Sequence, residues 1–438
     1  MAATPTHSPR SSHDEEDHHN TSTGAVDQAQ KKSPLGLPVS YAAPDGGLRA
    51  WLVAGGAAAI FLCTLGLGNS FGAFESYYLR HQLSSESESK IAWIGSLQSF
   101  LQFFSGMLGG PLFDRYASLV IYPSAAAYVF SIMILSLCTN YWQTMLVQGV
   151  LMGIVMGFLQ IPAFAAVSQH FDKKRAAALG ITVSGSSIGG IIMPIILSKM
   201  LNVSNLGFAW TVRIIGFVIL PFIVFACIVV RPHLPPRKAQ VFLWTPYKQP
   251  RFLILVAALF FMFIGMFTPF FYLPIYSTSH GMSTTLAGYL LAMINATSTL
   301  GRIIPGILAD KYGRLNIFAL GGVTTGIIIF CMTCATTNAG LIVYALFFGF
   351  TSGAIISGAS AAFASCPSDA RNMGTYMGMG MAVAGLGALI GPPINGAILE
   401  AYGGYLRVSM FSGALAVFGG VLAFTAKFST EGGILGRV

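Results

Sequence analysis

The chain has 438 residues, of which 54% are hydrophobic and only 9% are charged, and its mean hydropathy is +0.69. A soluble protein of this length needs far more charge to cover its surface, so this composition excludes a soluble globular fold and predicts helices that face lipid. The formal charge of +9 is spread over short loops between apolar runs, which argues against a nucleic-acid-binding face.

The first 43 residues are polar and lack the apolar core of a signal peptide. We expect residues 1–43 to form a disordered cytoplasmic tail. The tail contains the run His13–His19, which a metal ion could bind, but a solvated charge cluster is the better interpretation. The sequence therefore predicts no metal site and no cofactor.

Twelve apolar runs follow, each about 20 residues long and able to cross a hydrocarbon core of about 30 Å. The chain is therefore predicted to be an all-α, polytopic membrane protein. A proline-rich segment divides the first six runs from the last six, so we expect an N-terminal half at 44–230, a cytoplasmic linker at 231–251, a C-terminal half at 252–427 and a cytoplasmic tail at 428–438. The predicted helices are 50–74, 91–113, 117–138, 143–168, 176–198, 209–230, 252–276, 284–309, 315–335, 340–364, 373–399 and 405–427.

Most of the 24 Lys and Arg residues lie in the tails and in loops on one side of the predicted membrane. The positive-inside rule assigns that side, with both termini and the linker, to the cytoplasm. A glycosylation sequon at Asn202 then lies outside the cell and is a candidate glycan site. No retention signal is visible, so we expect the plasma membrane.

A glycine and a following aspartate recur in the loops after the second and the eighth predicted helix, 196 residues apart. Glycine lets two helices approach closely, the aspartate is suited to cap the N-terminus of a neighbouring helix, and the bases after it can hold the loop to it. This repeat of two six-helix halves resembles the major facilitator superfamily, which implies alternating access of the halves. The motif residues are Gly110, Asp114 and Arg115 in the first half and Gly306, Asp310, Lys311 and Arg314 in the second.

Two further motifs resemble the monocarboxylate porter family in particular. Asp45 precedes two glycines just before the first helix, and the segment Phe171-Asp-Lys173-Lys-Arg175 leads into the fifth. Asp45 is placed to cap the first helix, and we expect the basic triplet to lie against anionic lipid headgroups. Their expected roles are assembly and gating rather than contact with the substrate.

The resemblance implies that the transport chemistry resides in a lysine of helix 1 and in an Asp–Arg pair of helix 8. Here the three matching positions hold Asn69, Ser298 and Arg302. The arginine can still bind an anion, but the carboxylate that would take a proton is absent. We therefore expect transport to depend less on a pH gradient than in proton-coupled relatives.

Arg302 falls near mid-membrane, where a charge is costly and usually functional. Substrate contact and a purely structural bond to backbone carbonyls or to Ser298 are both open for it. Asn69 either lines the path or bonds a neighbouring helix. Three weaker candidates for contact with the substrate are Asn295, Gln160 and Tyr272.

The sequence thus predicts a secondary active transporter that moves a small organic anion, a monocarboxylate or a related acidic metabolite. The alternative is an efflux transporter for a larger, mostly neutral secondary metabolite, as in fungal branches of the resembling family, and a solute sensor that does not transport is a third hypothesis. No Walker motif and no convergent catalytic residues are present, so neither an ATP-driven pump nor an enzyme is expected. The expected partners are the solute and the lipid bilayer, with a coupling ion left open and no nucleic acid.

Overall fold

The computed structural model describes residues 43–202, 206–237 and 243–429, and these form helices joined by short turns. Most of the predicted tails, the central part of the linker and most of the sequon at Asn202 lie outside the described residues. Within the first half of the chain the helices are α2 (Gly47–Cys63), α3 (Leu65–Gly68), α4 (Phe71–Tyr77), α5 (Glu88–Phe104), α6 (Gly106–Tyr116), α7 (Ile121–Leu135), α8 (Tyr141–Thr144), α9 (Gly153–His170), α10 (Arg175–Asn202) and α11 (Gly207–Val229).

The second half has the same order of long helices. Its elements are α12 (Pro250–Met266), α13 (Thr268–Ser279), α14 (Thr284–Tyr312), α15 (Arg314–Phe330), α16 (Asn338–Ala364), α17 (Met373–Tyr402) and α18 (Tyr405–Thr425). Several predicted spans consist of consecutive helices: α2 to α4, α5 with α6, α8 with α9 and α12 with α13. Between α8 and α9 the chain forms a π-helix, Met145–Met152.

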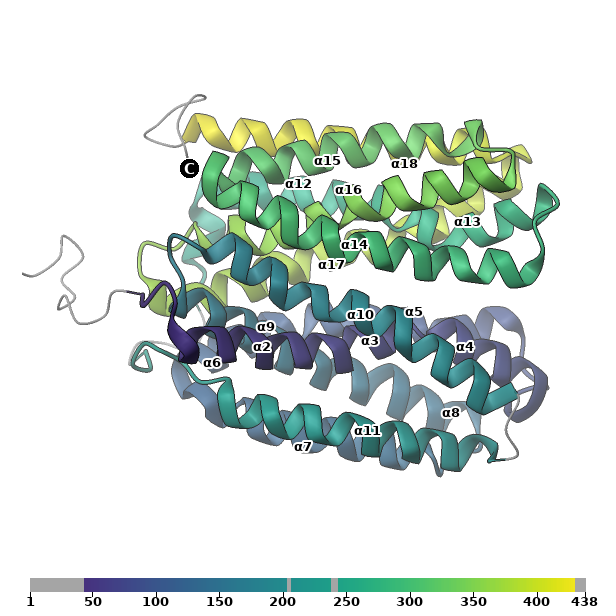
Figure 1. The fold of residues 1–438 in the computed structure, drawn as a ribbon, viewed down its shortest axis with the longest axis horizontal. Helices are drawn as coiled ribbons and strands as arrows, with labels where there is room; N and C mark the ends of the chain where they lie inside the picture. Colours follow the sequence, from purple (N-terminus) through teal and green to yellow (C-terminus); the bar gives the residue numbers. More distant parts are fainter. Residues whose placement is uncertain (1–42, 203–205, 238–242, 430–438) are drawn as a thin grey trace, which may run out of the picture. The chain divides into compact units, whose positions relative to one another are not determined.

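Ten helical segments of the described chain are long and apolar enough to cross a bilayer. A further stretch, Lys90–Leu119 followed by Ile121–Leu135, passes the same test and turns by 103° at its break. With this bent pair taken as one span, the described chain has up to 11 such segments, and the two arms of the pair overlap the predicted helices 91–113 and 117–138. In Figure 1 the long helices run side by side, with α10 next to α14.

Glycine determines how closely α6 packs against α17. A Cβ atom added to Gly110 would lie 1.9 Å from the Gly374 carbonyl oxygen, and one added to Gly378 would lie 2.0 Å from the Gly106 carbonyl oxygen. Only hydrogen on these α-carbons permits such an approach of two backbones. We call this contact between the two halves the α6–α17 seam.

A second close contact joins α10 to α14. A Cβ atom on Gly180 would lie 2.3 Å from the Arg302 carbonyl oxygen, and one on Gly306 would lie 2.7 Å from the Ala176 carbonyl oxygen. We call this contact the α10–α14 seam. Both seams therefore depend on glycines of the two repeated halves.

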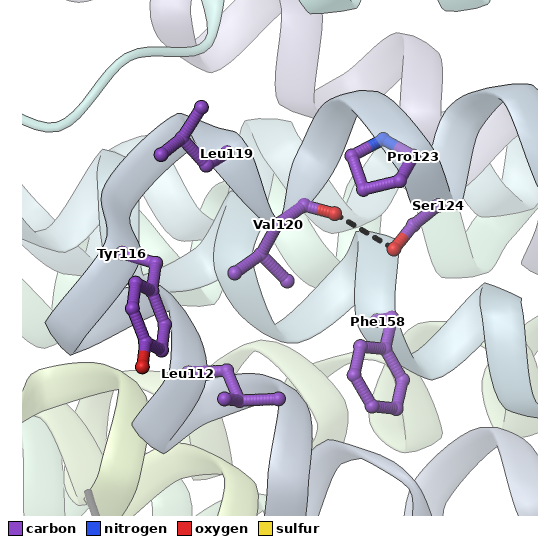
Figure 2. A pocket seen from close by; sticks show the side chains of 7 residues that line it. All are labelled: Leu112, Tyr116, Leu119, Val120, Pro123, Ser124 and Phe158. Carbon is purple, nitrogen blue, oxygen red and sulfur yellow. Dashed lines mark hydrogen bonds between the residues drawn. The ribbon is translucent and has the colours of Figure 1, made fainter.

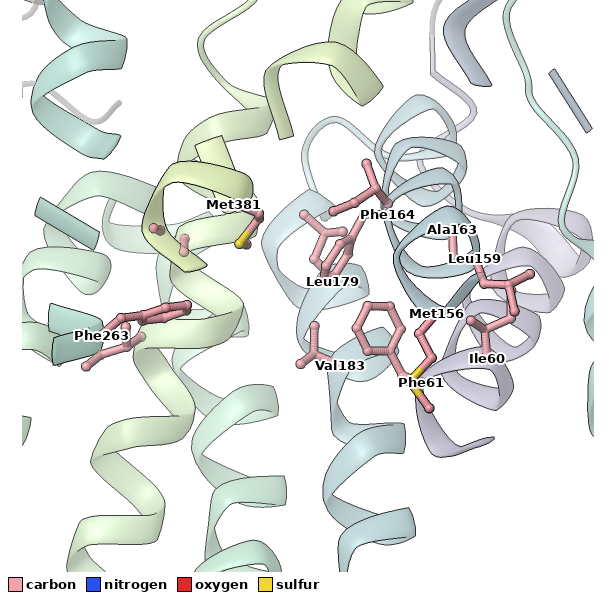
Figure 3. Close-up of a cluster of buried hydrophobic side chains, with 14 of the residues drawn as sticks. Ile60, Phe61, Met156, Leu159, Ala163, Phe164, Leu179, Val183, Phe263 and Met381 are labelled. Carbon is pink, nitrogen blue, oxygen red and sulfur yellow. The ribbon is translucent and has the colours of Figure 1, made fainter. Parts of the chain in front are cut away.

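Large apolar side chains fill the interior beside the seams. Figure 3 shows Phe61 of α2 beside Val183, and Phe164 of α9 beside Leu179, both on α10, and the centroids of the two phenylalanine rings are 4.5 Å apart. In a membrane such contacts stabilise the bundle mainly through van der Waals packing, because lipid is as apolar as the side chains. α10 thus packs against α2 of its own half and against α14 of the other half.

Candidate functional site

Asp114, in the last turn of α6, caps the start of α17. Its Oδ1 accepts a hydrogen bond from the Gly374 N–H at 3.0 Å, and its Oδ2 accepts from the Thr375 N–H at 2.7 Å and the Thr375 hydroxyl at 2.6 Å. The carboxylate is 4% exposed and meets the positive end of the helix dipole. The predicted cap by this aspartate is confirmed, whereas Arg115 lies over a neighbouring tyrosine ring, 5.6 Å from its centroid.

Asp310, in the last turn of α14, caps the start of α10 in the same way. Its two carboxylate oxygens accept hydrogen bonds from the Ala176 N–H at 3.0 Å and the Ala177 N–H at 2.8 Å. The base that bonds it is Arg314, at 3.4 Å, and Lys311 instead lies over the ring of the next residue. Each half therefore caps a helix of the other half.

A linker residue that the sequence analysis missed joins the two halves at the α6–α17 seam. The Arg237 backbone N–H donates to the Asp114 carbonyl oxygen at 2.8 Å, and its Nη1 donates to the Asn372 side-chain oxygen at 2.8 Å. Burial lowers the pKa of the Arg237 guanidinium, and the negative charges of Asp114 and Asp369 oppose that shift. Nothing in the sequence distinguishes this arginine from the other bases of the linker.

Asp45 does not cap the first helix, so that prediction is wrong. The chain enters α2 through Asp45 in a left-handed conformation, with φ of 54°, and α2 receives no side-chain cap. The Asp45 carboxylate instead accepts from the N–H groups of Asp172 at 2.6 Å and Lys173 at 2.7 Å, and its own N–H donates to the His170 carbonyl oxygen at 3.1 Å. The carboxylate thereby holds the turn between α9 and α10.

Arg175 is buried and does not face lipid headgroups, so the prediction for the basic triplet is wrong for this residue. Its side chain donates from Nε to the Phe171 carbonyl oxygen at 2.9 Å and from Nη1 to the Ala364 carbonyl oxygen, at the end of α16, at 3.3 Å. Lys173 is exposed. The centroids of the Trp51 and Phe171 rings are 4.9 Å apart. The start of α2 therefore packs against the turn that leads into α10.

Arg302 bonds across the α10–α14 seam. Its side chain is buried, and Nη1 donates to the Val183 carbonyl oxygen at 2.7 Å and to the Ser186 hydroxyl. The Arg302 Nε and the hydroxyls of Ser187 and Ser298 are buried and have no hydrogen-bond partner among the described residues. The Arg302 guanidinium thus bonds a backbone carbonyl in this structure. The hydroxyls of Ser187 and Ser298 and its own Nε are still unpaired among the described residues.

Asn69 and Asn295 come from opposite halves and meet at Gly190 of α10. The Asn295 Oδ1 lies 2.9 Å, and the Asn69 Nδ2 3.0 Å, from the point where a Gly190 Cβ would be. Asn69 is exposed, whereas Asn295 is buried and donates to the Leu291 carbonyl oxygen at 2.9 Å. The structure therefore brings these two predicted residues together, about two helical turns from Arg302 along α14.

Gln160 belongs to a buried amide cluster inside the first half. Its Nε2 donates to the Thr64 hydroxyl at 2.8 Å, and its Oε1 accepts from the Gln102 Nε2 at 3.2 Å. The Gln98 Oε1 nearby is buried without a partner among the described residues. The sequence analysis missed Gln98 and Gln102, although two glutamines four residues apart in an apolar helix are a detectable signal.

The remaining predicted residues lie apart from this centre. The Tyr272 hydroxyl donates to the Pro392 carbonyl oxygen at 2.8 Å and joins α13 to α17 within the second half. The side chain of Asn202 is not among the described residues. A groove with a volume of about 390 Å³ is lined by none of these residues. Figure 2 shows the side chains that line it. Its lining consists of Leu112, Tyr116, Leu119, Val120, Pro123, Ser124 and Phe158.

The chain matches the family model of the Major Facilitator Superfamily over residues 56–304 and 286–434. The chain belongs to this superfamily. It is therefore a multi-pass membrane transporter of small molecules and not an enzyme, and the predicted all-helical fold of about 12 helices is confirmed.

Three similar proteins come from fungi. The aspyridones efflux protein apdF of Emericella nidulans is 51% identical over 402 residues, which are 91% of this chain and 82% of that protein. The agnestins efflux protein AgnL12 of Paecilomyces divaricatus is 39% identical over 393 residues, covering 88% of this chain and 89% of its own. The fujikurins efflux protein of Gibberella fujikuroi is 38% identical over 391 residues, covering 88% and 83%.

Two solved structures share the fold. The human organic anion transporter MFSD10 (TETRAN) superposes with a TM-score of 0.70 at 15% identity, covering 86% of this chain and 100% of that one. The transporter FucP in the outward conformation superposes with a TM-score of 0.65 at 15% identity, covering 84% and 98%. At this identity the likeness shows the fold alone.

Proposed function

We propose that this transporter exports a fungal secondary metabolite from the cytoplasm, across the plasma membrane. The observation that carries the proposal is the 51% identity to a protein named for aspyridones efflux, because that identity extends over 91% of the chain and so over both halves. The relatives named for agnestins and fujikurins efflux support the same activity. This is the alternative that the sequence analysis placed second.

The polar groups at the centre suit a ligand that is mostly neutral. Asn69 and Asn295 each offer an amide that both donates and accepts hydrogen bonds, and Ser298 adds a buried hydroxyl. Arg302, the charged residue beside them, already donates to α10. Keto, amide and hydroxyl groups of a larger metabolite match such a site better than a lone carboxylate does.

The contacts between the halves support a gate at the predicted cytoplasmic end. The caps by Asp114 and Asp310 each join one half to the other, so both must break before the halves can separate there. Arg237 spans the same gap through Asp114 and Asn372. In this proposal the structure corresponds to the state closed toward the cytoplasm.

Arg302 changes partner during the proposed cycle. Its bonds to Val183 and Ser186 break when α10 and α14 separate, which frees its donors for a solute that enters from the cytoplasm. When the cytoplasmic side closes again, the Val183 carbonyl oxygen and the Ser186 hydroxyl compete with the solute for the Arg302 guanidinium. This competition favours release on the outer side, because a ligand shifts the equilibrium only by its differential affinity for the two states.

A small organic anion remains the second candidate for the substrate. It is favoured by the position of Arg302 and by the motifs at Asp45 and Phe171 that resemble the monocarboxylate porter family. A guanidinium freed in the open state would recognise a carboxylate with two parallel hydrogen bonds.

Comparing the metabolites of cells and medium, with and without the gene, tests the direction and class of transport. We expect at least one metabolite to accumulate in cells that lack the gene and to return to the medium when the gene is restored. A double variant, Asp114→Ala with Asp310→Ala, should fail to restore export, whereas Lys248→Gln in the exposed part of the linker should restore it fully. Unchanged metabolite levels, together with uptake of a monocarboxylate by reconstituted vesicles, would contradict export and favour the organic anion.

A further inference from the structure

A groove of about 350 Å³ lies between the start of α2 and the end of α11, away from the seams. Arg49, in the first turn of α2, and Arg231, just after α11, supply its two charged lining residues. Leu52, Ile228 and Val229 line the rest, and the side chains of Leu52 and Ile228 are exposed by 39% and 61%. The groove therefore joins two positive charges to an apolar surface at the predicted cytoplasmic edge of the membrane.

The positive charge of this groove is not neutralised by the part of the protein that the structure describes. Neither Arg49 nor Arg231 is in a salt bridge there. Both arginines lie beside the start of α2, where the positive end of the helix dipole adds to their charge.

We propose that this groove binds an anionic phospholipid of the cytoplasmic leaflet. The headgroup, which must carry a net negative charge, lies between Arg49 and Arg231, and one acyl chain follows Leu52 and Ile228. Basic pockets between transmembrane helices on the cytoplasmic side attract such headgroups, and the apolar wall gives the acyl chain a surface that a free anion does not use.

The groove lies next to the segment that leads to the gate. The Gln169 Oε1 accepts from the N–H groups of His233 at 3.1 Å and Leu234 at 3.3 Å, which fixes the linker just after Arg231. The same linker then reaches Asp114 through the Arg237 backbone. A lipid bound to α2 and Arg231 therefore restrains the linker and favours the state closed toward the cytoplasm.

Native mass spectrometry of the full chain tests the proposal, with phosphatidylserine and phosphatidylcholine of identical acyl chains as probes. Each basic residue near an anionic headgroup contributes about fivefold in affinity, so phosphatidylserine should be retained about 25-fold more strongly. Arg49→Gln or Arg231→Gln should each lower that preference by about fivefold, and the double variant should remove it. Lys248→Gln, an exposed basic residue of the same linker, is the matched control and should change nothing.

Thermal unfolding in phosphatidylcholine should be the same for all variants, which separates lost binding from lost folding. Equal retention of the two lipids by the unaltered chain would overturn the proposal, and so would a preference that survives in the double variant. Full displacement of phosphatidylserine by millimolar inorganic phosphate would also overturn it, because the site would then recognise a free anion.

Discussion

The α6–α17 and α10–α14 seams are built alike, but some equivalent positions hold different residues. Gly378 faces the carbonyl oxygen of Gly106 in the first seam, and Gly180 faces that of Arg302 in the second, so Gly106 and Arg302 occupy equivalent places. The close-packed glycines and the aspartate caps occur in both seams, whereas the buried guanidinium of Arg302 has glycine as its counterpart. An asymmetric solute would need such unrepeated groups, and the proposed function therefore places its site at the α10–α14 seam.

The two seams also differ in what stabilises their aspartate caps. Asp310 is bonded by Arg314 of its own loop, at 3.4 Å. Asp114 accepts an additional hydroxyl bond from Thr375, and the linker residue Arg237 binds its carbonyl oxygen. The first seam therefore involves the linker between the halves, while at the second Arg314 also donates from Nη2 to the Asp172 carbonyl oxygen of the other half.

The largest effect is expected from removing the unrepeated charge. Arg302→Ala breaks bonds to Val183 and Ser186, and hydrogen bonds to a charged group contribute about 1.5–3 kcal/mol each, so transport should fall by at least about tenfold. Arg302→Lys should rescue only partly, because an ammonium lacks the planar fork of donors. Export rates in vesicles, with membrane expression as the control, measure this. Near-normal export by the alanine variant would remove Arg302 from the candidate site.

Crowding the first seam should have the next largest effect. In Gly110→Val the new Cβ would lie 1.9 Å from the Gly374 carbonyl oxygen, and overpacking of this kind costs about 1–3 kcal/mol, so the seam should open and export should fall about tenfold. Spin labels at cysteines replacing Tyr116 and Tyr312 should move apart in pulsed spin-resonance measurements. Gly55→Val, where nothing lies within 4 Å of the added Cβ, is the matched control. An unchanged distance would show that close packing here does not hold the closed state.

Removing one cap at a time compares the two seams directly. Losing an N-cap costs about 1 kcal/mol, and Asp114→Ala also leaves the buried hydroxyl of Thr375 without its acceptor, so its effect should exceed that of Asp310→Ala. We expect about a tenfold and about a fivefold loss of export, respectively. The same spin-label distance should widen more in the Asp114 variant. The reverse order would contradict the idea that the first seam contributes more to closure.

The smallest effect should come from the bases beside the caps. Arg237→Gln removes a hydrogen bond to Asn372 that links the halves. Arg314→Gln removes the ion pair with Asp310 and a hydrogen bond from Nη2 to the Asp172 carbonyl oxygen of the other half. Each variant therefore loses one link between the halves, and export should fall about threefold in both. Lys248→Gln again serves as the control, and unchanged export in either variant would show that its arginine does not hold the closed state.

The sequence by itself determined the elements and their repeat. Apolar runs of about 20 residues specify spanning helices wherever they occur, because lipid requires every backbone group to bond within its own helix. The repeated motif around Asp114 and Asp310 also predicted the two caps. Its glycine lets a neighbouring helix approach, and its aspartate can then accept hydrogen bonds from the first N–H groups of that helix. These signals are local, and a reader of the sequence can find them.

Tertiary structure alone decided where the other polar groups bind. Asp45 bonds the turn before α10, 127 residues away in sequence, and Arg302 bonds α10 across 119 residues. Arg237 reaches Asn372 across 135 residues. Each side chain carries the same charge whichever partner it meets, so no local pattern specifies the partner. The partner is set by how closely the glycine seams bring helices of the two halves together.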